Sequence, residues 1–250
     1  MTTLALFSNK GGVGKTATAV NLAYLTAQSG RKTLICDLDP QSSTTFYFRV
    51  KPKLKRRARG LVKWGKPLNR SIKGTDYNNL DLLPADFTHR NLDITFDRLR
   101  HRKQRLDIVL RPLRKQYDLI ILDCPPTINI LAENIINASD YLLVPVVPTP
   151  LSVRTYQQLL VFLKNNGYTL DKVYAFFSMV DMHNLLHKNM ATNMYRQYQD
   201  ILWSPIPYLP EIEQMGVHRE PVAAFAPVSS AAKAYENLWG EIQRVVLKES

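Results

Sequence analysis

The feature that most constrains the fold of this chain is a glycine-rich loop near its start, Lys10-Gly11-Gly12-Val13-Gly14-Lys15-Thr16. Its Gly-Lys-Thr ending is that of a phosphate-binding loop, whose backbone N–H groups cradle phosphates. In such a loop Lys15 reaches the β- and γ-phosphates, and the Thr16 hydroxyl binds Mg²⁺. The common motif starts with glycine, where this chain has Asn9, so the later glycines supply the backbone freedom. We therefore predict a nucleotide-phosphate site here.

Lys10 is an additional lysine at the start of the loop. It lies on the far side of the loop from Lys15, where it is badly placed for its own nucleotide. From there it can reach phosphates bound to a second subunit that faces it. The flanking sequence has the context that the motif requires, with an apolar strand pattern before the loop and a helical pattern after it that Gly30 closes.

Short apolar runs alternate with helical patterns along the rest of the chain. Several runs, such as 119–122 and 141–144, are nearly unbroken, which indicates strands that are buried on both faces of a parallel sheet. The expected strands are 3–8, 32–37, 80–84, 118–123, 141–147 and 172–179. The expected helices are 16–28, 89–99, 103–115, 128–137, 152–165, 185–200 and 229–247. We predict an α/β fold with a doubly wound, mostly parallel twisted sheet and helices on both faces.

Acidic residues end two of these expected strands. Asp37 and Asp39 are two residues apart, so their carboxylates point to the same side, toward the phosphates and Mg²⁺. One can help to hold the metal's water shell and the other can orient the attacking water. Four apolar residues precede Asp123, which is the Walker B pattern, and this carboxylate would hold Mg²⁺ through water.

The chain has a net charge of +12, which suggests a polyanionic partner. Its 250 residues fit one domain over 1–250, and we expect a basic surface insertion at about 49–75. That insertion carries Lys55, Arg56, Arg57 and Arg59, which could bind the phosphates of a polyanion such as DNA or could only keep the surface soluble. A second basic block, 98–115, is open to another interpretation. Its leucines can form a buried stripe with the charges turned outward.

These motifs resemble those of the ParA/MinD family of deviant Walker ATPases, and most of all the short Soj-type ParA proteins. The resemblance covers almost the whole chain. Four segments carry it: Lys10 to Thr16, Asp37 to Gln41, Asp123 to Pro126, and the late segment Ile206 to Pro227.

The resemblance implies a slow ATPase, stimulated by a partner, with ATP and Mg²⁺ as its cofactors. ATP would lie between two subunits of a homodimer, with Lys10 crossing to the partner's phosphates. Asp39 matches the position that hydrolysis needs, which makes Lys10, Lys15 and Asp39 the expected catalytic residues. The expected metal-side residues are Thr16, Asp37 and Asp123. The expected cofactor-binding residues are Lys10, Gly11, Gly12, Val13, Gly14, Lys15, Thr16, Ala17, Pro207, Leu209, Pro210 and Glu211.

The resemblance also implies a cytoplasmic, nucleoid-associated protein that binds nonspecific DNA as an ATP dimer. A ParB-like adaptor on the cargo would release it by stimulating hydrolysis, and the cargo would be a plasmid, a chromosome or a protein assembly. The family usually places its DNA surface in the C-terminal region, where Lys188, Arg196 and Arg219 are the candidates.

The chain departs from the family pattern at two places on the adenine side. The strand before the adenine often ends in asparagine, and here it ends with Ser178 and Met179. The late segment often reads Pro-Arg-x-x-Arg, whereas 207–211 lacks both arginines. These departures leave the adenine contacts open.

Three other classes compete with this interpretation. A MinD-like membrane ATPase needs a C-terminal amphipathic anchor, and the apolar side chains of 238–246 could form one, although a core helix is favoured. An iron–sulfur relative needs suitably placed cysteines, and the chain has only Cys36 and Cys124. Neither that class nor a small-molecule kinase explains the positive charge.

Overall fold

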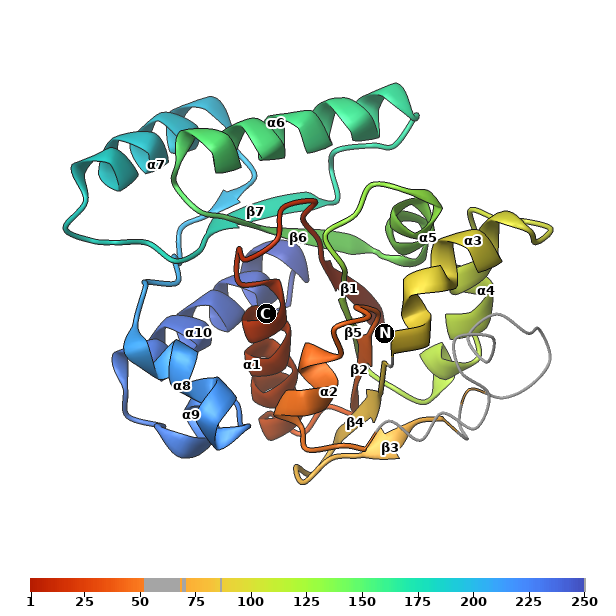
Figure 1. The fold of residues 1–250 in the computed structure, drawn as a ribbon. Coiled ribbons are helices and arrows are strands. Elements are labelled where there is room, and N and C mark those ends of the chain that lie inside the picture. Colours follow the sequence, from red (N-terminus) through yellow and green to blue (C-terminus); the bar gives the residue numbers. More distant parts are fainter. Residues whose placement is uncertain (52–67, 69–70, 86, 250) are drawn as a thin grey trace.

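The structure is a computed structural model, and it describes residues 1–51, 68, 71–85 and 87–249. An eight-stranded sheet forms its centre, in the order β3-β4-β2-β5-β1-β6-β7-β8 (Figure 1). Neighbouring strands are parallel, except that β3 pairs antiparallel with β4. The strands are β1 (Thr2–Leu6), β2 (Thr33–Asp37), β3 (Lys73–Gly74), β4 (Leu80–Leu83), β5 (Leu119–Asp123), β6 (Tyr141–Val146), β7 (Val173–Phe177) and β8 (Ile201–Leu202).

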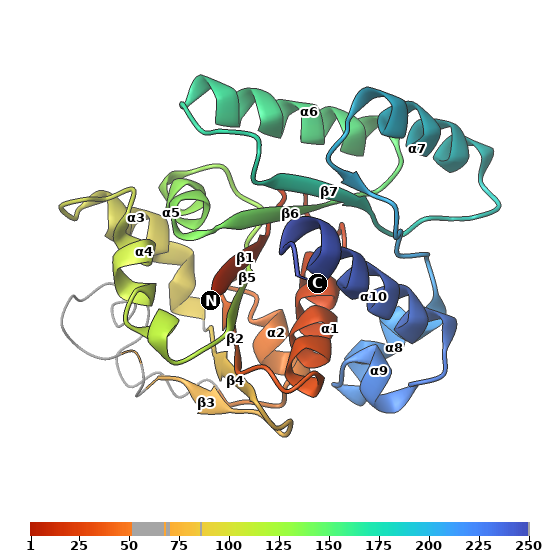
Figure 2. The ribbon, with the colours of Figure 1, turned by 180° about the vertical axis from the view of Figure 1, so that it is seen from behind.

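Helices cover both faces of this sheet (Figures 1 and 2). The α-helices are α1 (Lys15–Gln28), α2 (Ser43–Tyr47), α3 (Leu92–Asp97), α4 (Arg105–Leu110), α5 (Ile130–Ala138), α6 (Pro150–Asn165), α7 (Leu185–Gln197), α8 (Pro210–His218), α9 (Val222–Phe225) and α10 (Ser230–Glu241). Shorter helical turns are η3 (Phe87–Asn91), η4 (Leu113–Lys115) and η5 (Ile242–Val246).

Successive side chains of the central strands point to opposite faces of the sheet, so they belong to two separate cores. Ile120 and Leu122 of β5 pack with α3 to α7 on one face, whereas Leu119 and Ile121 pack with α1 and α8 to α10 on the other. Because both faces are covered, the central strands are apolar throughout, as the sequence indicated. The predicted doubly wound, mostly parallel α/β fold is confirmed, and each of the six predicted strands is found.

Within the basic block 98–115, the continuous helix predicted over 103–115 is wrong, because this segment forms two shorter helical pieces. Pro112 separates α4 from η4, because proline has no N–H to continue a helical ladder. Leu106, Leu110 and Leu113 are buried in the core. Several of its basic side chains pair with nearby carboxylates, including Lys103 with Glu133 at 2.6 Å. These contacts support the interpretation that this block is a helix face with its charges turned outward.

The apolar side chains of the C-terminal helix are mostly buried. Leu238, Ile242 and Val246 pack in the core with α1, and only Val245 of this stripe is markedly exposed. Within the described ranges, every helix is too short or too polar to cross a bilayer. The face that a membrane anchor would need is thus occupied by the protein's own core.

Candidate functional site

The phosphate-binding loop lies at the carboxyl end of β1 and leads directly into α1. Gly12 and Gly14 have positive φ angles of 68° and 86°, which side chains rarely adopt. A side chain on Gly11 or Gly12 would point into open space. The first backbone N–H groups of α1 have no intrahelical partner, and the first turn carries no acidic residue. This arrangement fits an anion at the helix N-terminus.

Gly14 also lets the loop approach the end of β7. A Cβ atom built on Gly14 would lie 2.7 Å from the Ser178 Oγ, closer than real contacts allow. Ser178 is itself buried. The departure from the family pattern at this position therefore has a structural role, because Ser178 is the residue against which the loop packs.

Lys15 is buried and turns back into its own loop. Its Nζ donates a hydrogen bond of 3.0 Å to the Lys10 carbonyl oxygen. Burial lowers the pKa of Lys15, while the nearby carboxylates of Asp123 and Asp39 raise it. Lys10, in contrast, is half-buried at the loop surface. The two lysines of the motif therefore have different surroundings, as expected if only Lys15 serves the subunit's own nucleotide.

Asp37 and Asp123 are direct neighbours across β2 and β5. Both are fully buried, and consecutive threonines of α2 hydrogen-bond to them. Thr44 donates its hydroxyl to Asp123 Oδ2 at 2.7 Å. Thr45 donates its hydroxyl at 2.7 Å and its backbone N–H at 2.9 Å to Asp37 Oδ2. Helix α2, which follows Asp39 closely in the sequence, is therefore attached to both carboxylates.

The environment of these two carboxylates fits a divalent cation. Burial and the charge of Asp123 raise the pKa of Asp37 to about 8. Burial likewise raises the pKa of Asp123 to about 6, although the Thr44 and Thr16 hydroxyls and Lys15 lower it. Asp123 Oδ1 is buried and receives no well-formed hydrogen bond from the described residues. A cation at this position would supply the charge and the contact that the pair lacks, with Thr16 as a third oxygen donor.

Asp39 lies just outside this buried pair. It is half-buried, and its backbone N–H donates to Asp37 Oδ1 at 3.2 Å. Its side chain accepts the backbone N–H of Gln41 at 2.9 Å. Its charge acts on both Lys15 and Asp123. Asp39 is thus the accessible carboxylate of the site, which is the position that a water-orienting group requires.

A mostly apolar pocket of about 250 Å³ adjoins the loop on the other side. Its walls come from the loop, α1, α2, the end of β7, the segment before α8, α8 itself and α10. The lining residues are Gly12, Gly14, Ala17, Tyr47, Ser178, Met179, Ile206, Pro207, Tyr208, Leu209, Ile212, Glu213 and Tyr235. This set includes Gly12, Gly14, Ala17, Pro207 and Leu209 of the predicted residues. Pro210 and Glu211 instead begin α8 and do not line the pocket.

Comparison with known proteins settles the family. The model of the AAA domain family matches residues 1–173. A virulence plasmid ParA family protein of Chlamydia psittaci is 32% identical over 256 residues, which cover 100% of this chain and 97% of that protein. The chain belongs to the ParA family. The sporulation initiation inhibitor protein Soj of Bacillus subtilis is 28% identical, over 96% of this chain and 97% of Soj.

A solved structure shares the fold of this chain. The ATP complex of an aspartate-to-alanine variant of Cyanothece McdA superposes with a TM-score of 0.83 at 22% identity, over 100% of this chain and 97% of McdA. The family resemblance stated from the motifs is confirmed by the Chlamydia psittaci relative, whose match covers the full chain.

The structure describes three of the predicted DNA-binding residues of this ParA-family chain, and these three do not form one patch. Lys188 and Arg196 are exposed on α7, on one side of the sheet. Arg219 ends α8 on the other side, where its Nε donates to the Phe46 carbonyl oxygen at 3.0 Å and its guanidinium covers the Phe46 ring. The cluster Lys55, Arg56, Arg57 and Arg59 lies outside the described residues.

Sequence reasoning missed several residues of the site, among them Thr44 and Thr45 of α2 and Ile212 and Glu213 of α8. Thr44 and Thr45 come two serines after the Asp-x-Asp-Pro-Gln motif, and two adjacent hydroxyls so close to buried carboxylates were a usable signal. Helix α8 also had a usable sequence signal. Pro210, Glu211 and Glu213 lie in its first turn, and proline and acidic residues are typical of a helix start. Tyr235, which lines the pocket from α10, left no comparable pattern.

Proposed function

We propose that this ParA-family protein binds ATP with Mg²⁺, hydrolyses it slowly, and uses the cycle to position or segregate a cargo on DNA. The observation that carries the proposal is the convergence of Lys15, Asp39 and the Asp37–Asp123 pair at the carboxyl edge of the sheet. The loop would bind the phosphates, and the 250 Å³ pocket beside it would hold the adenine. The curated relatives, a plasmid ParA family protein and Soj, support the same assignment.

Each residue of the site has a distinct part in this proposal. Lys15 would leave its contact with the Lys10 carbonyl and donate to the β- and γ-phosphates. Thr16 and the Asp37–Asp123 pair would hold Mg²⁺, which neutralises phosphate charge when it is bound. Asp39 would orient the attacking water, since it is the half-buried carboxylate next to this pair. The proton that water gives up would pass toward this carboxylate.

A homodimer with ATP at its interface is the second part of the proposal. Lys10 would reach the phosphates of the partner subunit from its exposed side of the loop. Large apolar side chains are exposed in the segments that follow β5, β6 and β7, at the same edge of the sheet as the loop. A dimer interface at this edge would bury them. They are Ile128, Leu151, Met182, Leu185 and Leu186.

The nonspecific DNA surface is the third part. Lys188 and Arg196 are exposed and free to meet phosphates, so α7 is the favoured described element. The Lys55 to Arg59 cluster remains a second candidate. A ParB-like adaptor on a plasmid, chromosome or protein assembly would stimulate hydrolysis, and the protein would be cytoplasmic and nucleoid-associated. A MinD-like membrane role has less support, because the C-terminal apolar face is buried in the core.

Sedimentation velocity tests the ATP-dependent dimer. The protein should sediment as a monomer without nucleotide or with ADP, and as a dimer with ATP–Mg²⁺ when Asp39→Ala slows hydrolysis. Adding Lys10→Ala to that variant should abolish the dimer, whereas Lys164→Ala, at an exposed lysine near the end of α6, should leave it intact. A monomer in every nucleotide state would overturn the proposal.

A further inference from the structure

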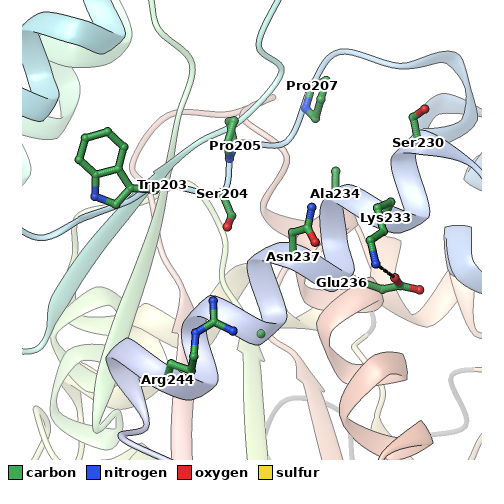
Figure 3. A pocket seen from close by; sticks show the side chains of 11 residues that line it. Trp203, Ser204, Pro205, Pro207, Ser230, Lys233, Ala234, Glu236, Asn237 and Arg244 are labelled. Carbon is green, nitrogen blue, oxygen red and sulfur yellow. Dashed lines mark hydrogen bonds and ion pairs between the residues drawn. The ribbon is translucent and has the colours of Figure 1, made fainter.

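A second hollow lies between the segment after β8 and the exposed side of α10 (Figure 3). Its volume is about 590 Å³, within the range of ligand sites. One wall is formed by Trp203, Ser204, Pro205 and Pro207. The other wall is one face of α10 and its continuation, which contributes Ser230, Lys233, Asn237, Gly240 and Arg244. We call this hollow the α10 groove.

The wall that carries Trp203 is held in place before any ligand arrives. Glu241 is buried, and its two carboxylate oxygens accept the backbone N–H groups of Trp203 and Ser204, each at 2.8 Å. The Trp203 ring stacks on Tyr195, with ring centroids 4.2 Å apart. Yet 70% of Trp203 remains exposed. A large aromatic side chain that is rigid and exposed is a typical anchor point for a binding partner.

The charges of the groove favour a ligand with a carboxylate. Lys233 is already paired with Glu236 at 3.1 Å, as Figure 3 shows. Arg244 forms no ion pair with any residue that the structure describes, and its guanidinium lies over Gly240, whose missing side chain leaves it room. A guanidinium offers two parallel donors that match a carboxylate. The chain's net charge of +12 also favours an acidic ligand.

We propose that the α10 groove binds an acidic segment of a partner protein, with an apolar ring or proline on Trp203 and a carboxylate on Arg244. Pro205 and Pro207 add flat apolar surface to the wall that carries Trp203, and Asn237 and Ser204 offer hydrogen bonds to a peptide backbone. The groove therefore provides the combination of contacts that an extended peptide uses.

Nucleic acid suits this groove less well. Binding to a phosphate backbone requires a series of cationic contacts, and here Arg244 is the one cation of the described groove without a carboxylate partner. Prolines also replace two backbone N–H donors in the facing wall.

The groove shares a wall with the proposed adenine pocket, because Pro207 lines both. Helix α10 also borders both cavities, because Ala234 lines the groove and Tyr235 lines the pocket. The shared segment 206–208 is fixed to the residues that follow β7. The backbone N–H of Val180 donates to the Ile206 carbonyl at 3.0 Å, and the backbone N–H of Tyr208 donates to the Val180 carbonyl at 3.0 Å. Ligands on its two sides should therefore affect each other's affinity, an inference that rests on the proposed nucleotide site.

Fluorescence anisotropy on the full chain tests the groove. The probes are short labelled peptides in which proline, leucine or tryptophan alternates with aspartate or glutamate, matched peptides with lysine in the acidic positions, and a single-stranded oligothymidylate. The acidic peptides should bind the nucleotide-free protein best. Trp203→Ala and Arg244→Glu should each weaken this binding roughly tenfold or more. Lys164→Glu, on the other side of the sheet, makes the same charge change as Arg244→Glu and should leave it unaltered.

Several outcomes would overturn the inference. They are failure of every acidic peptide to bind, equal binding of the lysine peptides, preference for oligothymidylate, or unchanged affinity in both groove variants when their circular dichroism matches the parent protein. Repeating the titration with ATP–Mg²⁺ tests the link to nucleotide, and an unchanged peptide affinity would refute that link alone. Failure of the protein to bind ATP would refute the nucleotide proposal, while the nucleotide-free titration would still decide on the groove.

Discussion

Thr45 donates two hydrogen bonds to a single oxygen of Asp37, from its hydroxyl at 2.7 Å and its backbone N–H at 2.9 Å. The same hydroxyl accepts the backbone N–H of Ala85, at the end of β4, at 3.0 Å. All three groups are buried. Through this single side chain, helix α2 is attached both to the buried Asp37 carboxylate and to the segment that follows β4.

Replacing Thr45 by valine should destabilise the protein by about 2 kcal/mol, because a buried carboxylate oxygen and a buried N–H both lose a partner. Thr45→Ser keeps the hydroxyl and should retain most of the stability. Urea unfolding measures the difference. Equal free energies of unfolding for the valine and serine variants would contradict this role of the hydroxyl.

Replacing Gly14 by alanine should lower stability by about 1–2 kcal/mol from its positive φ alone, with a further loss from the clash with Ser178 Oγ. Adding Ser178→Ala removes that oxygen and should restore only the stability that the clash had cost. A double-mutant cycle of unfolding free energies separates the two parts. Strictly additive effects of the two substitutions would mean that the loop does not press on Ser178.

Substitutions of Lys15 and Asp39 should impair different steps of the ATPase cycle. Lys15→Ala removes the phosphate contact and should abolish ATP binding. Asp39→Asn should leave the ATP affinity nearly unchanged but slow hydrolysis by about 100-fold or more, because a water-orienting base is lost. Titration with a fluorescent ATP analogue and a phosphate-release assay measure the two quantities. An Asp39→Asn variant that hydrolyses ATP at the parent rate would remove Asp39 from the mechanism.

Arg196 and Arg219 were both expected to bind DNA, and the structure separates them. Arg196→Glu should weaken nonspecific duplex binding and change stability by less than about 0.5 kcal/mol, since the side chain is exposed. Arg219→Glu should cost about 1 kcal/mol of stability through the lost Phe46 contacts and affect duplex binding less. The opposite ranking in duplex affinity would assign the DNA surface to the α8 side of the molecule.

The long apolar strands and the glycine loop were predictable because their signals are local and strong. Six strands and the parallel architecture followed from short apolar runs, and Asp37 and Asp123 were both expected on the metal side. The short elements gave no such signal. β3 and β8 contain two residues each, and such edge pairings depend on tertiary contacts rather than on a periodic pattern.

Helix α2 was missed for a different physical reason. Its five residues include two β-branched threonines, which have a modest helix propensity. The helix exists because Thr44 and Thr45 hydrogen-bond to carboxylates that are distant in sequence. The α10 groove likewise brings Trp203 and Arg244 together only in the folded chain.

The most direct test of the central claim is the binding of a nonspecific DNA duplex without nucleotide, with ADP and with ATP–Mg²⁺, each across a salt series. Binding should require ATP–Mg²⁺ and weaken steeply with salt, with a log–log slope of roughly −0.9 for each phosphate contact. Equal binding in all three nucleotide states, or no binding in any of them, would contradict an ATP-switched, DNA-binding positioning ATPase.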